Sequence, residues 1–358
     1  MSYLLAFIGF SALVMLHELG HFWAAKRVGM RVERFSLFFP PHIWKKTKGE
    51  TEYCIGVIPL GGYVRIMGMN PNEEIAPDLQ DRSYSRMAVN KRIFVIAAGP
   101  LMNVLVAFVI LFGLFLVVGL SSASSTIDQT EPGSPAAGAL RPGDKLISVD
   151  GQTGDVAQLG AAISKHRCAG TPIDGCTATT PVRVVVERGG REQTLLLTPR
   201  YDAAAKKTRL GFNFAVDHRT LGPVDAASHS FSEMWRVSTA TMSALSRLVY
   251  DPQARKEISG VVGSYEVTRQ SFEFDLAQAL SVLAIISLSL ALINLFPFLP
   301  LDGGHIFWAI AEKLRGRPIA YSVMERASAI GFVLVLILFA VGLSNDISRL
   351  QGDGFGLR

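Results

Sequence analysis

Apolar residues in this chain gather into four long runs that are separated by more polar segments. A helix that crosses a bilayer needs about 20 mainly apolar residues, and each run is close to that length or longer. The pattern predicts a polytopic α-helical membrane protein with four transmembrane helices, at roughly Tyr3 to Ala25, Ile93 to Leu120, Leu276 to Leu299 and Ala327 to Leu343.

The segment between the second and third runs has a different pattern. From Ile127 to Pro199, short β-type runs such as Val182 to Val186 alternate with turn signals such as Asp150-Gly151. This pattern is typical of a small domain with several short strands. Further on, Phe231 to Tyr250 is amphipathic. That segment fits either a helix on the outer membrane surface or an ordinary packed helix, and the sequence does not separate the two.

The predicted organisation follows from these patterns. The segments in chain order are a first transmembrane helix (1–25), a cytoplasmic β-rich or re-entrant loop (26–92), a second transmembrane helix (93–120), an inserted α+β domain (121–200), a connector with an amphipathic helix (201–275), a third transmembrane helix (276–308), a cytoplasmic loop (309–326), a fourth transmembrane helix (327–344) and a tail (345–358).

Composition agrees with a membrane protein. Hydrophobic residues make up 49% of the chain and charged residues 18%, and the mean hydropathy is +0.31. The net charge of +5 comes without a long basic run. Basic residues in membrane loops account for this charge more simply than nucleic-acid binding does. The lipid bilayer is therefore the expected partner, and a nucleic acid is not expected.

Loop charges predict how the chain is oriented. Lys and Arg are concentrated in the loop from Lys26 to Arg92 and in the short loop from Lys313 to Arg326. Cytoplasmic loops of membrane proteins carry such an excess of positive charge. Both loops are therefore predicted to be cytoplasmic, and both termini and the inserted domain are predicted to be extracytoplasmic.

The first apolar run contains the sequence His17-Glu18-Leu19-Gly20-His21, an HExxH pattern. Residues i and i+4 share one face of a helix, so both imidazoles can reach one Zn²⁺ ion. Glu18 lies beside them and can act as a general base. Ionisable residues inside a membrane span are costly and are usually functional. Buried, merely hydrogen-bonded histidines are the less favoured alternative.

A hydrolytic zinc site has three protein ligands and one water, so a third ligand is needed. Asp302 follows the third apolar run and precedes Gly303 and Gly304. His17 lies about 24 Å of helix from the outer end of the first run, so it is expected near the cytoplasmic side. The third run crosses inward and brings Asp302 to the same side.

At these residues the chain resembles the site-2 protease family. The family's HExxH and LDG motifs match His17 to His21 and Leu301-Asp302-Gly303. The resemblance implies that Asp302 is the third ligand of one Zn²⁺ per chain. Asn294 and Pro297 match the longer family motif, which implies that Pro297 binds substrate and that Asn294 helps to hold the substrate or stabilises the oxyanion through its amide. Pro300 lies six residues after Asn294, where the commonest form of the motif has five.

Two further segments resemble the same family. Pro59 to Val64 matches its P-x-G-G-Y-V element, which implies that Gly61, Gly62 and Tyr63 bind substrate at a strand edge; a simple hairpin turn is the alternative. Ala98 to Asn103 matches G-P-x-x-N. Asn103 is expected either to order the site by hydrogen bonding or to pack or cap a helix. His305 is expected to support the site or to pack, rather than to bind the metal.

Ala136 to Gly151, AAGALRPGDKLISVDG, resembles a PDZ domain. Such domains bind an extended peptide at a sheet edge, so a peptide or a substrate ectodomain is the implied partner of the inserted domain. Cys168 and Cys176 lie in this domain, eight residues apart, in a turn-rich loop. An oxidising exterior permits a disulfide between them, and two free thiols are the alternative. Cys54 is expected to stay reduced.

The resemblance covers nearly the whole chain. It implies a zinc-dependent intramembrane endopeptidase of a bacterial plasma (inner) membrane, which cuts transmembrane segments of single-span proteins such as anti-sigma factors. Two other classes of protein fit parts of the sequence. A membrane zinc transporter or sensor would need ligands along a path, whereas the sequence offers one compact set. A catalytically dead PDZ scaffold would be expected to lack one of the four site residues His17, Glu18, His21 and Asp302.

Overall fold

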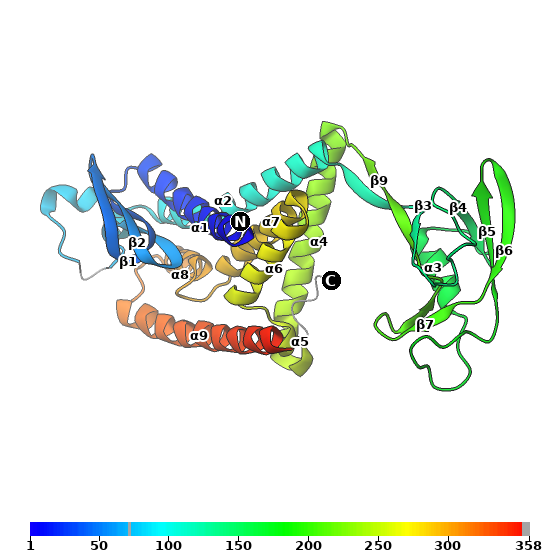
Figure 1. Cartoon of the computed structure of the whole chain (residues 1–358). Helices are drawn as coiled ribbons and strands as arrows, with labels where there is room; N and C mark the ends of the chain where they lie inside the picture. The colour runs from blue at the N-terminus through cyan, green and yellow to red at the C-terminus, as the bar shows by residue number, and fades with distance from the viewer. Residues whose placement is uncertain (71–72, 353–358) are drawn as a thin grey trace. The chain divides into compact units, whose positions relative to one another are not determined.

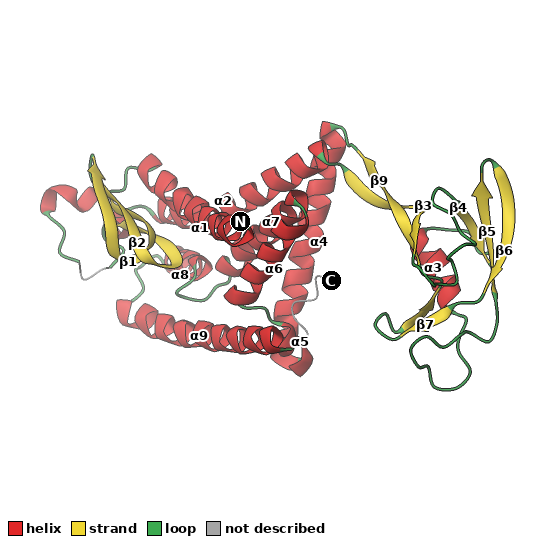
Figure 2. Cartoon of the chain, in the orientation of Figure 1, coloured by secondary structure: helices red, strands yellow, loops and turns green. Residues whose placement is uncertain are grey.

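A computed structural model of the chain describes residues 1–70 and 73–352. The chain divides into two compact units, each of which is described below by itself (Figures 1 and 2). The first unit consists of Met1–Val117 and Gly222–Arg358 and is mainly helical. The second unit, Val118–Leu221, is inserted between these two parts and is built mainly from strands. The predicted combination of apolar helices with an inserted β domain is therefore present.

Four helices of the first unit are long and apolar enough to cross a membrane. They are α1 (Ser2–Arg27), α2 (Val89–Val117), α7 (Leu276–Asn294) and α9 (Tyr321–Gln351). They match the four predicted runs, but the predicted bounds of the second and fourth helices are wrong. The α2 helix stops at Val117 because Leu120 already belongs to a strand. The α9 helix extends well beyond 327–344, since its polar flanks continue the same helix.

The third predicted helix, 276–308, is wrong as a single element. The α7 helix ends at Asn294, and a separate helix, α8 (Asp302–Arg315), begins at the LDG aspartate. Proline lacks an N–H and disfavours helical geometry in the preceding residue, so Pro297 and Pro300 break the helix between them. The predicted cytoplasmic loop 309–326 is also helical as far as Arg315, where Gly316 ends α8 in the left-handed conformation (φ +72°).

The predicted connector contains three helices, α4 (Pro223–Tyr250), α5 (Pro252–Glu257) and α6 (Val261–Phe274). The amphipathic segment forms most of α4. Its Met234 and Val237 pack in one cluster with Leu111 of α2 and Leu288 of α7. The helix packs through these two residues while Phe231 and Trp235 are exposed, so its placement on the outer membrane surface stays a prediction.

Between α1 and α2 the chain forms a small antiparallel sheet from β1 (Val32–Lys48) and β2 (Thr51–Ile66). Both strands fold back on themselves, so that residues 34–37 pair with 62–65 on one side and with 52–55 on the other. Residues 42–48 pair with 51–56 at the far edge. Residues 62–66 therefore form an edge strand. Two short 3₁₀ helices, η1 (Pro77–Arg82) and η2 (Tyr84–Arg86), lead into α2.

The second unit is a five-stranded antiparallel sheet in the order β6-β5-β4-β3-β9. Its elements are β3 (Leu120–Thr130), β4 (Lys145–Val149), α3 (Val156–Ser164), β5 (Val182–Arg188), β6 (Arg191–Leu197), the hairpin of β7 (Arg200–Asp202) and β8 (Lys207–Arg209), and β9 (Phe212–Arg219). Ile127, Leu159 and Val184 lie in its core.

The predicted end of this domain at residue 200 is wrong. The strand β9 pairs with β3, more than 80 residues earlier in the chain, and its Phe212 and Phe214 pack against the domain core. Such a long-range pairing leaves no local signal in the sequence. In the loop after α3, Cys168 and Cys176 are joined by a disulfide, and Cys54 is a buried free thiol in β2.

Candidate active site

The HExxH pattern lies in the middle of α1, where the residues are helical throughout. His17 and His21 are both 7% exposed and lie one turn apart on the buried face of the helix. That face comes unusually close to α2, because a Cβ atom on Gly20 would overlap the carbonyl of Ala98. Glu18 is half-buried beside the two histidines.

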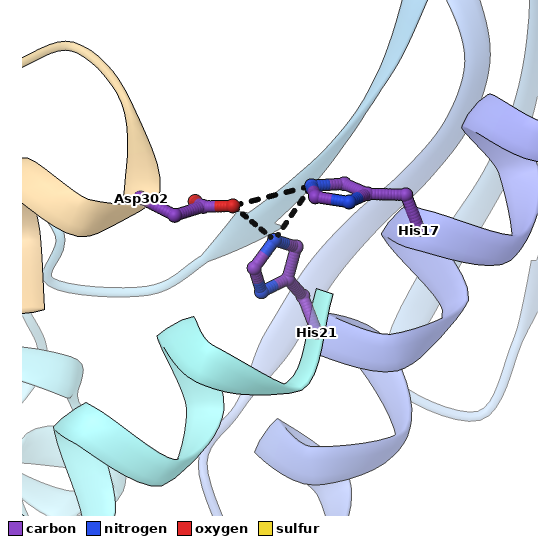
Figure 3. Close-up of side chains that lie close together, drawn as sticks. All are labelled: His17, His21 and Asp302. Carbon is purple, nitrogen blue, oxygen red and sulfur yellow. Dashed lines mark hydrogen bonds and ion pairs between the residues drawn. The ribbon is translucent and has the colours of Figure 1, made fainter. Parts of the chain in front are cut away.

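Asp302 completes the cluster from the other end of the chain. It is the first residue of α8, and its Oδ2 atom lies 3.2 Å from Nε2 of His17 and 3.3 Å from Nε2 of His21. The two Nε2 atoms are 3.2 Å apart. Figure 3 shows the three side chains pointing toward one another from α1 and α8. Among the described residues these three form the one cluster with metal-ligand geometry.

The three atoms form a nearly equilateral triangle, and its size fits a metal ion. Tetrahedral zinc has bonds of about 2.0–2.1 Å to nitrogen and oxygen, which places neighbouring ligand atoms about 3.3 Å apart. The observed edges of 3.2, 3.2 and 3.3 Å agree with that value. Two imidazole nitrogens and one carboxylate oxygen are also a ligand set typical of catalytic zinc.

Glycines at the start of α8 allow Asp302 to reach this position. A Cβ atom on Gly303 would overlap the carbonyl oxygens of Leu295 and Phe296, and one on Gly304 would overlap the backbone at Leu299. The first turn of α8 therefore packs directly on the chain that links it to α7. A larger residue at either position would push Asp302 away from the histidines.

The helix α2 contacts both histidines from the side opposite Asp302. Nδ1 of His21 lies 2.9 Å from the carbonyl oxygen of Val95, and Nδ1 of His17 lies 3.2 Å from the side-chain amide of the fully buried Asn103. Between them, a Cβ atom on Gly99 would overlap the His21 ring. The sequence pattern included Gly99 and Asn103 in the G-P-x-x-N match but assigned no role to Gly99, and it missed Val95. Their spacing of four residues along α2 is the signal that places all three on one face.

The edge strand 62–66 passes close to the acid of the HExxH pattern. A Cβ atom on Gly62 would lie 3.2 Å from Cγ of Glu18, so the absence of a side chain there leaves space beside the carboxylate. Gly61 has a φ of +155°. The Tyr63 hydroxyl lies 3.1 Å from Nε2 of His42, and its ring stacks on Phe39. These contacts hold Tyr63 within the sheet, and its role toward a substrate stays a prediction.

The remaining predicted residues are close to Asp302 in the sequence, but among the described residues they form no hydrogen bond with the three clustered side chains. Asn294 is the last residue of α7, and Pro297 lies in the link to α8. His305 is one turn after Asp302 in α8 and is half-buried. In residues 1–70 and 73–352, no hydrogen bond joins Asn294 or His305 to the three clustered side chains. Their functional roles stay predictions.

Comparison with known proteins places this arrangement in a family. The family model described as Peptidase family M50 matches residues 5–338. The chain is 29% identical to the regulator of sigma-E protease RseP of Salmonella typhimurium, over 96% of this chain and 97% of that protein. It is 28% identical to protease RseP of Yersinia pestis, with the same shares covered.

A protein of Rhizobium meliloti that is named as a candidate zinc metalloprotease is 30% identical over 95% of this chain and 94% of its own length. The match to the family model covers the HExxH helix, the edge strand, α2 and the LDG helix in one alignment. The chain therefore belongs to peptidase family M50, which confirms the predicted site-2 protease type and, with it, the prediction of a membrane-embedded metalloprotease.

Proposed function

We propose that this protein is a zinc-dependent endopeptidase that cuts the transmembrane segments of single-span membrane proteins. The observation that carries the proposal is the triangle of His17 Nε2, His21 Nε2 and Asp302 Oδ2, with edges of 3.2–3.3 Å, beside Glu18. Two of the ligands and the acid belong to a helix that is apolar enough to cross a membrane. Peptide hydrolysis within the bilayer is the chemistry that this combination serves best.

His17, His21 and Asp302 would hold one Zn²⁺ per chain. A zinc ion at such a site supplies a Lewis acid that polarises the scissile carbonyl and lowers the pKa of water. Glu18 takes the proton from the attacking water and passes it to the leaving amine. Asn294 contributes its amide to the stabilisation of the oxyanion.

The edge strand 62–66 offers a place for the substrate. A transmembrane helix must unwind locally before its backbone becomes accessible, and an extended segment can then pair with a free strand edge. Gly62 lies next to Glu18, so a peptide paired along Gly61, Gly62 and Tyr63 would pass close to the catalytic acid. Pro297, in the link before Asp302, would limit the path of the substrate on the other side.

The name of the Salmonella relative connects that protein with sigma-E regulation and proteolysis, and the Yersinia relative is named as a protease. We accordingly propose anti-sigma factors as substrates, in regulated intramembrane proteolysis at a bacterial inner membrane. The distribution of Lys and Arg supports a site near the cytoplasmic side, with both termini and the inserted domain outside. The inserted domain is then a PDZ-like module that binds a peptide or the shortened ectodomain of the substrate.

The decisive comparison is between wild type and Glu18→Gln, which keeps the size of the side chain and removes its basicity. Both purified proteins are expected to contain about one zinc per chain. Cleavage of a panel of single-span substrates is expected to fall by about 10²–10⁴-fold in the variant, as for the loss of a general base. Equal cleavage by both proteins would contradict the proposal. So would zinc transport into vesicles by a wild type that cuts no substrate.

A further inference from the structure

One face of α2 presents three successive positions to the two histidines. Val95, Gly99 and Asn103 are four residues apart, and all three are buried. The first contributes a carbonyl oxygen to His21, the second leaves room for the His21 ring, and the third places its amide against His17. The helix α2 is thus the common support of both imidazoles, although it carries none of the three clustered side chains.

The contact with Val95 determines where the hydrogen of His21 lies. A carbonyl oxygen can only accept a hydrogen bond. Nδ1 of His21, 2.9 Å from the Val95 oxygen, must therefore carry the hydrogen and donate it. The lone pair of the neutral ring is then on Nε2, which is the atom that faces Asp302 and His17.

For His17, the position of the ring hydrogen depends on a different partner, Asn103. Nε2 of His17 faces the cluster, and Nδ1 of the same ring lies 3.2 Å from the side-chain amide nitrogen of Asn103. The oxygen and nitrogen of a side-chain amide exchange places when the group turns by half a rotation, and hydrogen-bond partners decide which orientation is correct. The other amide atom of Asn103 has no partner among the described residues. No competing contact therefore fixes the amide, and the imidazole decides its orientation.

We propose that Asn103 is a positioning residue that accepts a hydrogen bond from Nδ1 of His17 through its amide oxygen. This bond matches the bond from His21 to the Val95 carbonyl and leaves both Nε2 lone pairs directed at the metal position. The proposal rests on the zinc site proposed above. Histidine ligands commonly donate their second N–H to such an acceptor, and its loss typically costs about 10–100-fold in metal affinity.

The backbone of Asn103 makes a separate contact with α7. The hydroxyl of Ser287, a fully buried residue of α7, donates a hydrogen bond of 2.9 Å to the carbonyl oxygen of Asn103. This bond joins α7 to the backbone of α2 and involves neither the amide of Asn103 nor His17. Ser287 therefore provides a matched control, because Ser287→Ala removes a buried hydrogen bond at the same residue but leaves the amide in place.

The test is the zinc dissociation constant of the full-length protein in detergent, measured by competition with a chromophoric chelator. Asn103→Leu keeps the approximate volume but removes the acceptor, and zinc affinity is expected to fall about 10–100-fold. Asn103→Asp keeps an oxygen acceptor in the same place and is expected to stay close to wild type. The zinc affinity of Ser287→Ala is also expected to stay close to that of wild type. Thermal unfolding of each zinc-free protein shows whether the variants are folded.

Two outcomes would overturn the inference while the proposed function stands. One is wild-type affinity in Asn103→Leu. The other is an equal loss in Asn103→Asp and Asn103→Leu, which would mean that the amide acts as a donor. A wild-type protein that binds no zinc at this site would instead remove the proposed function itself, and the inference with it.

Discussion

At the scale of single residues, the metal cluster depends on missing side chains as much as on those present. Gly20 lets α1 approach the Ala98 carbonyl of α2, and Gly99 lets the His21 ring lie against α2. Gly303 and Gly304 let the turn that carries Asp302 pack against the backbone of the link between α7 and α8. Each of these contacts is with backbone or with a held ring, so an added methyl group has no flexible neighbour to displace.

Gly99→Ala tests this account directly. The added Cβ would overlap the His21 ring, so the ring must move off the metal position. Substrate cleavage is expected to fall by about 100-fold, given that misplacement by about 1 Å can cost that much in rate, and zinc content is expected to fall as well. Gly113→Ala, in the same helix with open space around it, is the control. It is expected to leave zinc content unchanged and to stabilise α2 slightly.

At the scale of elements, α8 is a short helix whose position determines where Asp302 lies. Two contacts join its later turns to the start of α2. Glu312 forms an ion pair with Arg92, and Lys313 donates a hydrogen bond of 2.8 Å to the side chain of Asn90. Arg92 and Glu312 are both largely buried. The helix α2 thus supports the third ligand as well as the two histidines.

Breaking the Arg92–Glu312 pair is therefore expected to weaken the metal site from a distance. Glu312→Ala and Arg92→Ala are each expected to cost about 1–3 kcal/mol of stability, since each leaves a partly buried charge unpaired, and to speed zinc release to a chelator. The exchanged pair, Arg92→Glu with Glu312→Arg, is expected to recover part of that loss. If the exchanged pair releases zinc faster than both single variants, the ion pair does not hold α8 in place.

The sequence predicted this site better than it predicted the elements around it. The spacing of His17 and His21 predicts a shared helix face, and the loop charges bring Asp302 to the same side of the membrane. Pro297 and Pro300 indicate a break in the helix, but the sequence does not place the ends of α7 and α8, because apolar residues continue from Leu295 to Leu301 and hydropathy does not register a change of direction. The contacts of Val95 and Gly99 depend on how α2 is rotated about its axis, which only tertiary packing fixes.

At the scale of the whole molecule, the inserted unit has its own core and its own buried ion pair. The carboxylate of Asp144, 2% exposed, accepts hydrogen bonds of 2.7 and 2.6 Å from Arg188 and one of 2.8 Å from the Arg141 backbone. The Arg188 guanidinium holds the pKa of Asp144 below its ordinary value, with help from the Arg141 N–H. Asp144 lies in the Arg141-Pro142-Gly143-Asp144 turn, so that turn also ties β4 to β5.

A lowered pKa in the folded domain has a defined consequence for stability. The contribution of Asp144 is fully present above the carboxyl's unfolded pKa of about 3.9 and is lost as the pH falls through the folded value. Asp144→Asn is expected to lower the free energy of unfolding by roughly 2–3 kcal/mol at neutral pH. It is also expected to make the free energy of unfolding depend less steeply on pH in the acid range. The measurement is the free energy of unfolding of residues 118–221 against pH. An unchanged acid slope in the variant would contradict this assignment.

The proposed chemistry depends on one metal ion held by His17, His21 and Asp302. Zinc K-edge absorption of the purified full-length protein tests this most directly. We expect about one zinc per chain with two imidazole nitrogens and carboxylate or water oxygen at about 2.0–2.2 Å and no sulfur ligand, and we expect Asp302→Ala to remove one oxygen ligand. A zinc-free protein, a sulfur ligand, or an unchanged spectrum in His17→Ala would show that these three residues do not hold a zinc ion.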